Sequence, residues 1–122
     1  MSDRASGDRA DDCLFCRIVA GEVPADVVLD TDVALAFRDV NPQAPVHLLV
    51  IPKQHLPSLE VLAEQHGALL AGLVGAVNQA AAQAGVAGGF RVVTNIGASA
   101  GQSVDHLHLH VLGGRPMRWP PG

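Results

Sequence analysis

Apolar and polar residues alternate along residues 104–112, close to the end of the chain. Successive side chains of a strand point to opposite faces, so this period of two predicts a strand. One face of the strand would be aliphatic and would enter the core. The other face would carry three imidazoles side by side, those of His106, His108 and His110.

Shorter apolar runs predict four further strands, over residues 27–29, 33–37, 47–51 and 90–94. The first two flank the turn-like cluster Asp30-Thr31-Asp32, which is typical of a hairpin. The third run stops at Pro52, and the stretch 39–42 before it is expected to be a loop, because proline restricts the residue that precedes it.

Two segments have a helical pattern. Residues 14–20 predict a short helix that ends before Gly21. Apolar residues also recur at helical spacing through residues 64–84, and Gly85 ends this run. Ser58 is the expected N-cap where the helical region opens.

The length and charge of the chain limit what it can bind. Its 122 residues suffice for one domain and not for two. A formal charge of -4, without a run of Lys or Arg, argues against nucleic-acid binding. The longest apolar stretch, residues 68–77, is too short to span a membrane. Residues 1–12 are polar and lack a signal-peptide pattern, so we interpret them as a flexible tail of a cytoplasmic protein, ahead of a single domain over residues 13–122.

Three histidines on one strand face favour catalysis over a single metal site. A strand advances about 3.3 Å per residue, which places the outer two imidazoles roughly 13 Å apart. One metal ion with ligand bonds near ~2 Å cannot bind all three. A lone histidine here would as easily be a hydrogen-bonded core residue, but three at strict spacing indicate divided roles in one site.

The loop ahead of these histidines offers a place for a phosphate. Gly97 and Gly101 let the backbone approach a ligand closely, and loop N–H groups can bind an anion. Ser103 follows at the entrance to the predicted strand. Because neutral imidazole is a competent nucleophile near neutral pH, the loop and the histidines together favour phosphoryl-type chemistry.

Cys13 and Cys16 form a Cys-x-x-Cys pair. In a reducing compartment this spacing indicates metal binding or redox chemistry rather than a structural disulfide. A closed tetrahedral zinc site needs two more ligands, and the six histidines are the candidates. Two buried thiols without a metal are the alternative, whereas no thioredoxin-like βαβ order supports a redox pair.

Several motifs resemble a known family. The segment Gly101-Gln102-Ser103-Val104-Asp105-His106-Leu107-His108-Leu109-His110-Val111-Leu112 resembles the signature of the histidine triad (HIT) proteins. The stretches 39–45 and 47–53, and the ending Trp119-Pro120-Pro121-Gly122, are similar to the Hint branch of that family. The resemblance extends over residues 13–122, which is nearly the whole chain.

The resemblance implies a fold and an activity. The fold is α+β, with a five-stranded antiparallel sheet and two helices, in a homodimer whose sheets join into one of ten strands. The activity is hydrolysis of purine nucleoside phosphoramidates, such as adenosine monophosphate joined to a lysine or another amine. The middle histidine, here His108, attacks the α-phosphorus, and water resolves the nucleotidyl-histidine without any cofactor.

The resemblance also assigns roles to matching residues. His110 contacts the phosphate, Ser103 assists the leaving group, and His47 lies behind the nucleophile and orients it. Asp39 binds the ribose hydroxyls. Further nucleotide contacts are expected from Phe37, Val40, Ile18, Asn95, Gly101 and Gln102, and Trp119 would reach the leaving-group side of the partner subunit's site.

Some of these residues also have purely structural interpretations. Asp39 could cap a turn, His47 could be a hydrogen-bonded core histidine, and Trp119 could anchor the tail by packing. Phe37 and Ile18 could belong to the core rather than to a wall around the base.

Some bacterial relatives bind zinc through such a cysteine pair and two histidines, which correspond here to His55 and His106. Four protein ligands leave no open coordination position, so the resemblance implies a structural zinc at Cys13, Cys16, His55 and His106.

Two other functions stay open. One is hydrolysis of dinucleoside polyphosphates, and the other is a zinc-stabilised nucleotide-binding or regulatory module without significant catalysis. The ending at residues 119–122 favours the phosphoramidase. The complete set of His47, Ser103, His108 and His110 favours an enzyme over a module that only binds.

Overall fold

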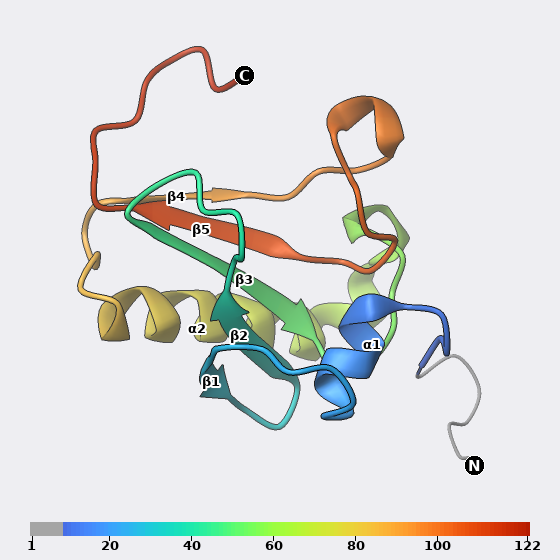
Figure 1. Cartoon of the computed structure of the whole chain (residues 1–122). Helices are drawn as coiled ribbons and strands as arrows, with labels where there is room; N and C mark the ends of the chain where they lie inside the picture. Colours follow the sequence, from blue (N-terminus) through green and yellow to red (C-terminus); the bar gives the residue numbers. More distant parts are fainter. Residues whose placement is uncertain (1–8) are drawn as a thin grey trace.

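The computed structural model describes residues 9–122, which build a five-stranded antiparallel sheet with two α-helices (Figure 1). The strands are β1 (Val27–Asp30), β2 (Ala34–Arg38), β3 (Val46–Pro52), β4 (Phe90–Val93) and β5 (Leu109–Gly113), in the order β1-β2-β3-β5-β4. The helices are α1 (Leu14–Val19) and α2 (Gly67–Gln83), and short 3-10 turns lie at Leu59–Val61, Glu64–His66 and Ala98–Ala100. The expected α+β fold is confirmed.

The alternation of side chains along β2 and β3 separates two apolar clusters, one on each face of the sheet. The cluster on the α2 face contains Ala34, Ala36, Leu48, Val50, Leu73 and Val77. The cluster on the α1 face contains Cys13, Phe15, Cys16, Leu35, Phe37, Leu49 and Ile51. In Figure 1, α2 runs along one side of the sheet, and α1 lies on the other side near the end of β3. The two cysteines of the candidate metal site belong to the α1-side cluster.

The region between β3 and α2 begins as the sequence indicates but is not one continuous helix. The side chain of Ser58 accepts a hydrogen bond from the Glu60 N–H, so the predicted cap is present. It caps the short turn at Leu59–Val61 rather than α2. The apolar spacing over residues 64–84 corresponds to α2 together with the 3-10 turn at Glu64–His66 that precedes it.

The predicted strand over residues 104–112 is wrong for its first half, because β5 begins only at Leu109. The backbone of residues 106–108 leaves the sheet and pairs with the loop after β3, where the Leu107 N–H donates to Leu56 O at 2.6 Å. The alternation of faces nevertheless persists through the irregular segment. Leu107, Leu109 and Val111 all belong to the cluster on the α2 face.

The two ends of the described chain lie apart. At the N-terminal end, Arg9 pairs with Glu22 at 2.6 Å and the Cys13 N–H donates to Ala10 O. The sequence predicts a flexible tail over residues 1–12. Positions 1–8 of this segment lie outside the described residues. The C-terminal tail leaves the end of β5 that is distant from α1 (Figure 1). Within residues 9–122, no helix has both the length and the apolar character needed to cross a membrane.

Candidate active site and metal centre

His108 lies between β5 and α1 and is almost fully buried, with 5% of its surface exposed. Its Nδ1 lies 2.7 Å from the carbonyl oxygen of His106. A carbonyl oxygen only accepts hydrogen bonds, so Nδ1 carries a proton, and in the neutral ring the lone pair is on Nε2. Thr94 Oγ1 donates to the carbonyl of His108 at 2.9 Å and secures its backbone. The ring is thus held in the tautomer that a nucleophile needs at Nε2.

A chain of hydrogen bonds also sets the tautomer of His110. The backbone N–H of Gln43 donates to His47 Nδ1 at 3.0 Å, so the proton of His47 resides on Nε2. That Nε2 lies 2.9 Å from His110 Nδ1, which therefore accepts. The remaining Nε2–H of His110 is free to donate to an anion. The rings of His108 and His110 lie 5.1 Å apart, centroid to centroid.

His47 and His110, the two histidines joined by this hydrogen bond, are both neutral near pH 7. Burial lowers the pKa of His47, and the charge of Asp39 opposes this shift only in part. Burial, and then the proximity of His108 and His47, lowers the pKa of His110 to about 4. A neutral His110 can donate from Nε2 while accepting at Nδ1. The expectation that His47 lies behind the nucleophile is refined by this geometry, because its direct hydrogen bond goes to His110.

Asp39 combines the turn role with a position in the site. One carboxylate oxygen accepts from the Asn41 N–H at 2.8 Å and closes a turn. The other lies 3.4 Å from His47 Nε2. Ligating atoms of Asp39, His47 and His110 lie within 4.8 Å of one another. A hydrogen bond of 2.9 Å joins His47 and His110, and the Asp39 carboxylate lies beside the same His47 nitrogen, so the three form a polar network.

The loop over residues 95–103 is fixed by its own side chains. Gly101 has φ +98°, a conformation that favours glycine, and Asn95 lies beside it. Gln102 accepts from the Gly97 N–H and donates to the carbonyls of Pro57 and Val104, so its side chain braces the loop. Ser103 lines a cavity of about 480 Å³, together with Ala10, Asp12, Cys13, Leu14, His55, Val104 and Asp105.

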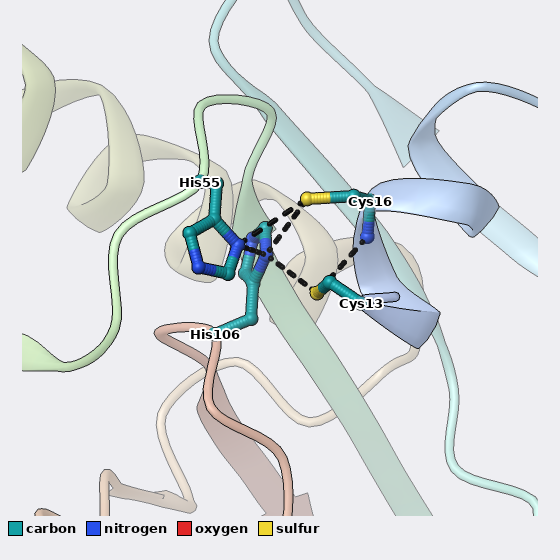
Figure 2. Close-up of side chains that lie close together, drawn as sticks. All are labelled: Cys13, Cys16, His55 and His106. Carbon is teal, nitrogen blue, oxygen red and sulfur yellow. Dashed lines mark hydrogen bonds between the residues drawn. The ribbon is translucent and has the colours of Figure 1, made fainter. Parts of the chain in front are cut away.

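The expected zinc ligands do come together, from three separate segments of the chain (Figure 2). Cys13 and Cys16 lie at the start of α1, His55 follows β3, and His106 precedes β5. Cys13 Sγ lies 3.4 Å from His106 Nδ1, and Cys16 Sγ lies 3.3 Å and 3.6 Å from the Nδ1 atoms of His55 and His106. The two Nδ1 atoms are 3.2 Å apart.

These distances fit a tetrahedral ion. Zinc bonds of about 2.0 Å to nitrogen and about 2.3 Å to sulfur give tetrahedral edges of about 3.3 Å between nitrogens and about 3.5 Å between nitrogen and sulfur. Burial lowers the pKa of His106 to about 4, so its ring is neutral and Nδ1 can bind a metal. Its Nε2–H donates to Pro52 O at 2.9 Å, which orients the ring toward the thiols. The four residues can hold a metal ion.

The expected nucleotide contacts divide into buried and exposed positions. Phe37 is buried, and Ile18 packs partly buried against the same α1-side cluster. Val40 is fully exposed, at 100%. Trp119 is 82% exposed on the C-terminal tail, which leaves β5 at the end distant from α1.

Phe15 is the contact that sequence reasoning missed. Its ring meets His106 and His108 edge to face, at centroid distances of 5.8 Å and 5.2 Å, and it also meets Phe37. The only signal for it in the sequence is its place inside the Cys-x-x-Cys pair, which fixes it to the helix that carries two of the candidate ligands.

Comparisons with known proteins agree on one family. A family model described as the HIT domain matches residues 20–117. An uncharacterised HIT-like protein of Synechocystis is 51% identical over 113 residues, which cover 93% of this chain and 99% of that protein. A solved HIT family hydrolase from Legionella pneumophila is 46% identical with a TM-score of 0.88, covering 91% of this chain and all of that one. Another, from Clostridium thermocellum, is 39% identical with a TM-score of 0.86, covering 89% and 96%.

Proposed function

The chain belongs to the HIT family, and on that premise we propose that it hydrolyses purine nucleoside 5′-phosphoramidates through a nucleotidyl intermediate on His108. Two of its structural relatives are described as HIT family hydrolases, which supports a hydrolase. The observation that carries the proposal is the hydrogen bond from His108 Nδ1 to the carbonyl of His106. It leaves Nε2 as an unprotonated nitrogen on a fixed ring.

Two displacements at phosphorus make up the reaction. In the first, the lone pair of His108 Nε2 forms a bond to the α-phosphorus while the P–N bond of the substrate breaks. The departing amine takes a proton, which we assign to the hydroxyl of Ser103, replenished from water. In the second, water attacks phosphorus and gives up the proton that restores the Ser103 hydroxyl, the electron pair of the P–N bond returns to His108 Nε2, and the nucleoside monophosphate leaves.

Neighbouring residues would bind and stabilise the substrate. The free Nε2–H of His110 and the N–H groups of the Gly101 loop suit the phosphate oxygens, whose charge grows in the transition state. The carboxylate oxygen of Asp39 that the turn leaves unused suits the ribose hydroxyls. Phe37, Ile18 and Val40 would flank the base, with Asn95 and Gln102 shaping the loop. Trp119 would act on the leaving-group side of the other subunit in a homodimer.

We also propose that Cys13, Cys16, His55 and His106 hold one structural zinc ion. Two thiolates and two imidazole nitrogens are a donor set that zinc prefers, and the spacing of their atoms suits it. The ion would supply a cross-link between three segments of the chain and no catalytic step, since four protein ligands fill its coordination sphere.

The first prediction concerns the intermediate. On brief incubation with an adenosine phosphoramidate and rapid quenching, the wild-type protein should gain the mass of one adenylyl group, mapped to His108 by peptide mass spectrometry. His108→Asn should lose turnover by about 10³-fold or more while AMP binding, measured by calorimetry, persists, because the asparagine cannot form the adduct.

The matched control is His66→Asn, which changes a histidine outside both clusters and should act at the wild-type rate. Wild-type turnover by His108→Asn would overturn the mechanism. Faster cleavage of a diadenosine polyphosphate than of the phosphoramidate would instead favour the other hydrolase. A wild-type protein that binds AMP without any turnover would be a binding module.

A further inference from the structure

His106 connects the candidate metal centre to the candidate nucleophile. Its ring Nδ1 lies among the thiols and His55. Its backbone carbonyl accepts the hydrogen bond from His108 Nδ1. We propose that the metal centre is a positioning device for the nucleophile, in which ligation of the His106 ring holds its carbonyl where it fixes the tautomer and orientation of His108. This inference deepens the proposed function and rests on it.

The sheet pairs none of the backbone of the segment that carries both histidines, which is held by side-chain hydrogen bonds to Pro52 and Thr94 and by the buried Leu107. Residues 106–108 precede β5 and are not part of its strand pairing. The backbone of the segment is instead tied to the loop after β3, through Leu107 N–H and Leu56 O. That same loop carries the ligand His55, next to Leu56. Holding the ligands together therefore holds both partners of this hydrogen bond.

Phe15 provides a second connection between the two sites. It lies on α1 between the cysteine ligands, and its ring packs edge to face on both His106 and His108. A shift of α1 away from the ligand cluster would take this ring with it. The nucleophile is thus held on one side by a carbonyl and on another by an aromatic ring, and both belong to segments that the ligand set joins.

Without the ion, the cluster has weak internal bonds. Two thiols and two imidazole nitrogens would face one another through weak S–H donors, in a site where His106 is 0% exposed. Separation of the ligands would release the 106–108 segment, and the carbonyl of His106 would no longer hold the proton of His108 at Nδ1. A ring with its proton on Nε2 has no lone pair there, so the reactive fraction would fall.

The test measures the tautomer of His108 without substrate and at one fixed pH. The full-length protein is labelled with ¹⁵N-histidine, and metal analysis counts its zinc. In the zinc-loaded protein, two-dimensional NMR should show His108 as a single Nδ1–H tautomer. After removal of zinc by a chelator, both tautomers should appear, and exchange of the Nδ1 proton with water should accelerate about tenfold, as expected for the loss of one buried hydrogen bond.

Variants of His55 separate metal loss from other effects of the chelator. His55→Ala removes one ligand together with its ring contact to His106, leaves residues 106–108 themselves unchanged, and should reproduce the metal-free spectrum of His108. His55→Cys supplies another zinc ligand and should restore the single tautomer. His66→Ala is the control for a histidine outside the cluster, and its spectrum of His108 should match the wild type. The signals of His47 and His110 report whether the rest of the site is intact.

Three outcomes would overturn the inference. The first is purified protein without zinc whose His108 already shows the single tautomer. The second is an unchanged His108 spectrum after complete loss of zinc. The third is collapse of the whole fold on zinc removal, because the metal would then act globally and not through His106. Failure of the proposed function looks different, as a zinc-loaded protein with the single tautomer that forms no adduct with the phosphoramidate.

Discussion

The tautomer and the charge of His110 are both set by the groups around it. Its Nδ1 accepts from His47, which in turn accepts from a backbone N–H, so its tautomer is fixed by a backbone group two hydrogen bonds away. Burial keeps the ring neutral, with its pKa lowered to about 4. An imidazole that can donate without being charged suits a phosphate contact next to a nucleophile that must itself stay unprotonated.

The burial of His110 has a consequence for stability in acid. An unfolded histidine has a pKa near ~6.5, so between pH ~6.5 and about 4 the unfolded chain binds a proton that the folded protein does not. The contribution of the buried, neutral His110 ring to the free energy of unfolding is therefore full above pH ~6.5 and is lost as the pH falls through this window. His110→Gln should lose free energy of unfolding less steeply there, measured by urea titration at several pH values.

The control for this prediction is His66→Gln, which should follow the wild-type slope. His106 and His47, whose pKa values burial also lowers, are present in all three proteins, so their direct contributions are shared by the comparison. Equal slopes for wild type and His110→Gln would show that folding does not lower the pKa of His110.

At the scale of elements, a glycine in β5 and a glycine in α2 differ in the space that a side chain would find there. A Cβ added to Gly113, near the end of β5, would stand 2.8 Å from a methyl carbon of the buried Val86 and 2.9 Å from its Cβ. A Cβ added to Gly75, on the exposed side of α2, would meet nothing within 4 Å. The same substitution should therefore have opposite effects in these two elements.

Gly113→Ala should destabilise the protein by about 1–3 kcal/mol, because the strand and Val86 must shift apart. Gly75→Ala should stabilise it by about 0.5–1 kcal/mol, because alanine loses less conformational entropy in a helix. Both values are free energies of unfolding from denaturant titration with zinc present. A stabilising Gly113→Ala would contradict the close packing of Val86 against β5.

The elements that the sequence predicted best are those with a repeating local pattern. The hairpin of β1 and β2, the strand β3 and the helix α2 follow from spacing and turn residues that act over a few positions. The start of β5 was misjudged because alternation continues through residues 104–108, while the pairing that takes them out of the sheet involves Leu56, far away in sequence. The hydrophobic pattern predicts which face each side chain takes. It does not predict which segment the backbone of these residues pairs with.

Some features of the candidate site can likewise be predicted from the sequence, and others cannot. The types of residue that can bind metal or attack phosphorus are visible in the sequence, and the family resemblance named the four residues that the structure brings together as a cluster able to hold a metal ion. The tautomers of His108 and His110 depend on a carbonyl and on an N–H group, which every residue possesses, so no sequence pattern reveals them. Phe15 was missed because an aromatic residue in a short helix is more commonly part of the core.

At the scale of the whole molecule, the sheet has two edges, β1 and β4. An edge strand exposes backbone groups that can pair with another chain. Val92, in the middle of β4, is 44% exposed, and Val27 on β1 is similarly exposed. The tail that carries Trp119 is tied to β4 through the Arg91 side chain and the carbonyl of Arg118. Joining two β4 edges would bring this tail close to the second subunit, as the proposed homodimer requires.

The oligomeric state tests this arrangement. Light scattering during gel filtration should give about twice the chain mass of 12.6 kDa. Val92→Lys should shift the protein toward the monomer, because a charge on the joining edge opposes pairing. Val27→Lys makes the same change on the opposite edge and should leave the dimer intact. Loss of the dimer in Val27→Lys alone would place the interface at β1.

The stretch from Leu107 to Val111 keeps its aliphatic side chains in the core against α2 and its histidines on the opposite face. Alternate positions of this stretch therefore have different roles, one set in core packing and the other on the face that carries the histidines. Exchanges among aliphatic residues at 107, 109 and 111 would change heat tolerance, exchanges at 108 and 110 would change the proposed chemistry, and an exchange at 106 would remove a proposed zinc ligand. An engineer could adapt this protein to a hotter process through the first set while leaving its reaction untouched.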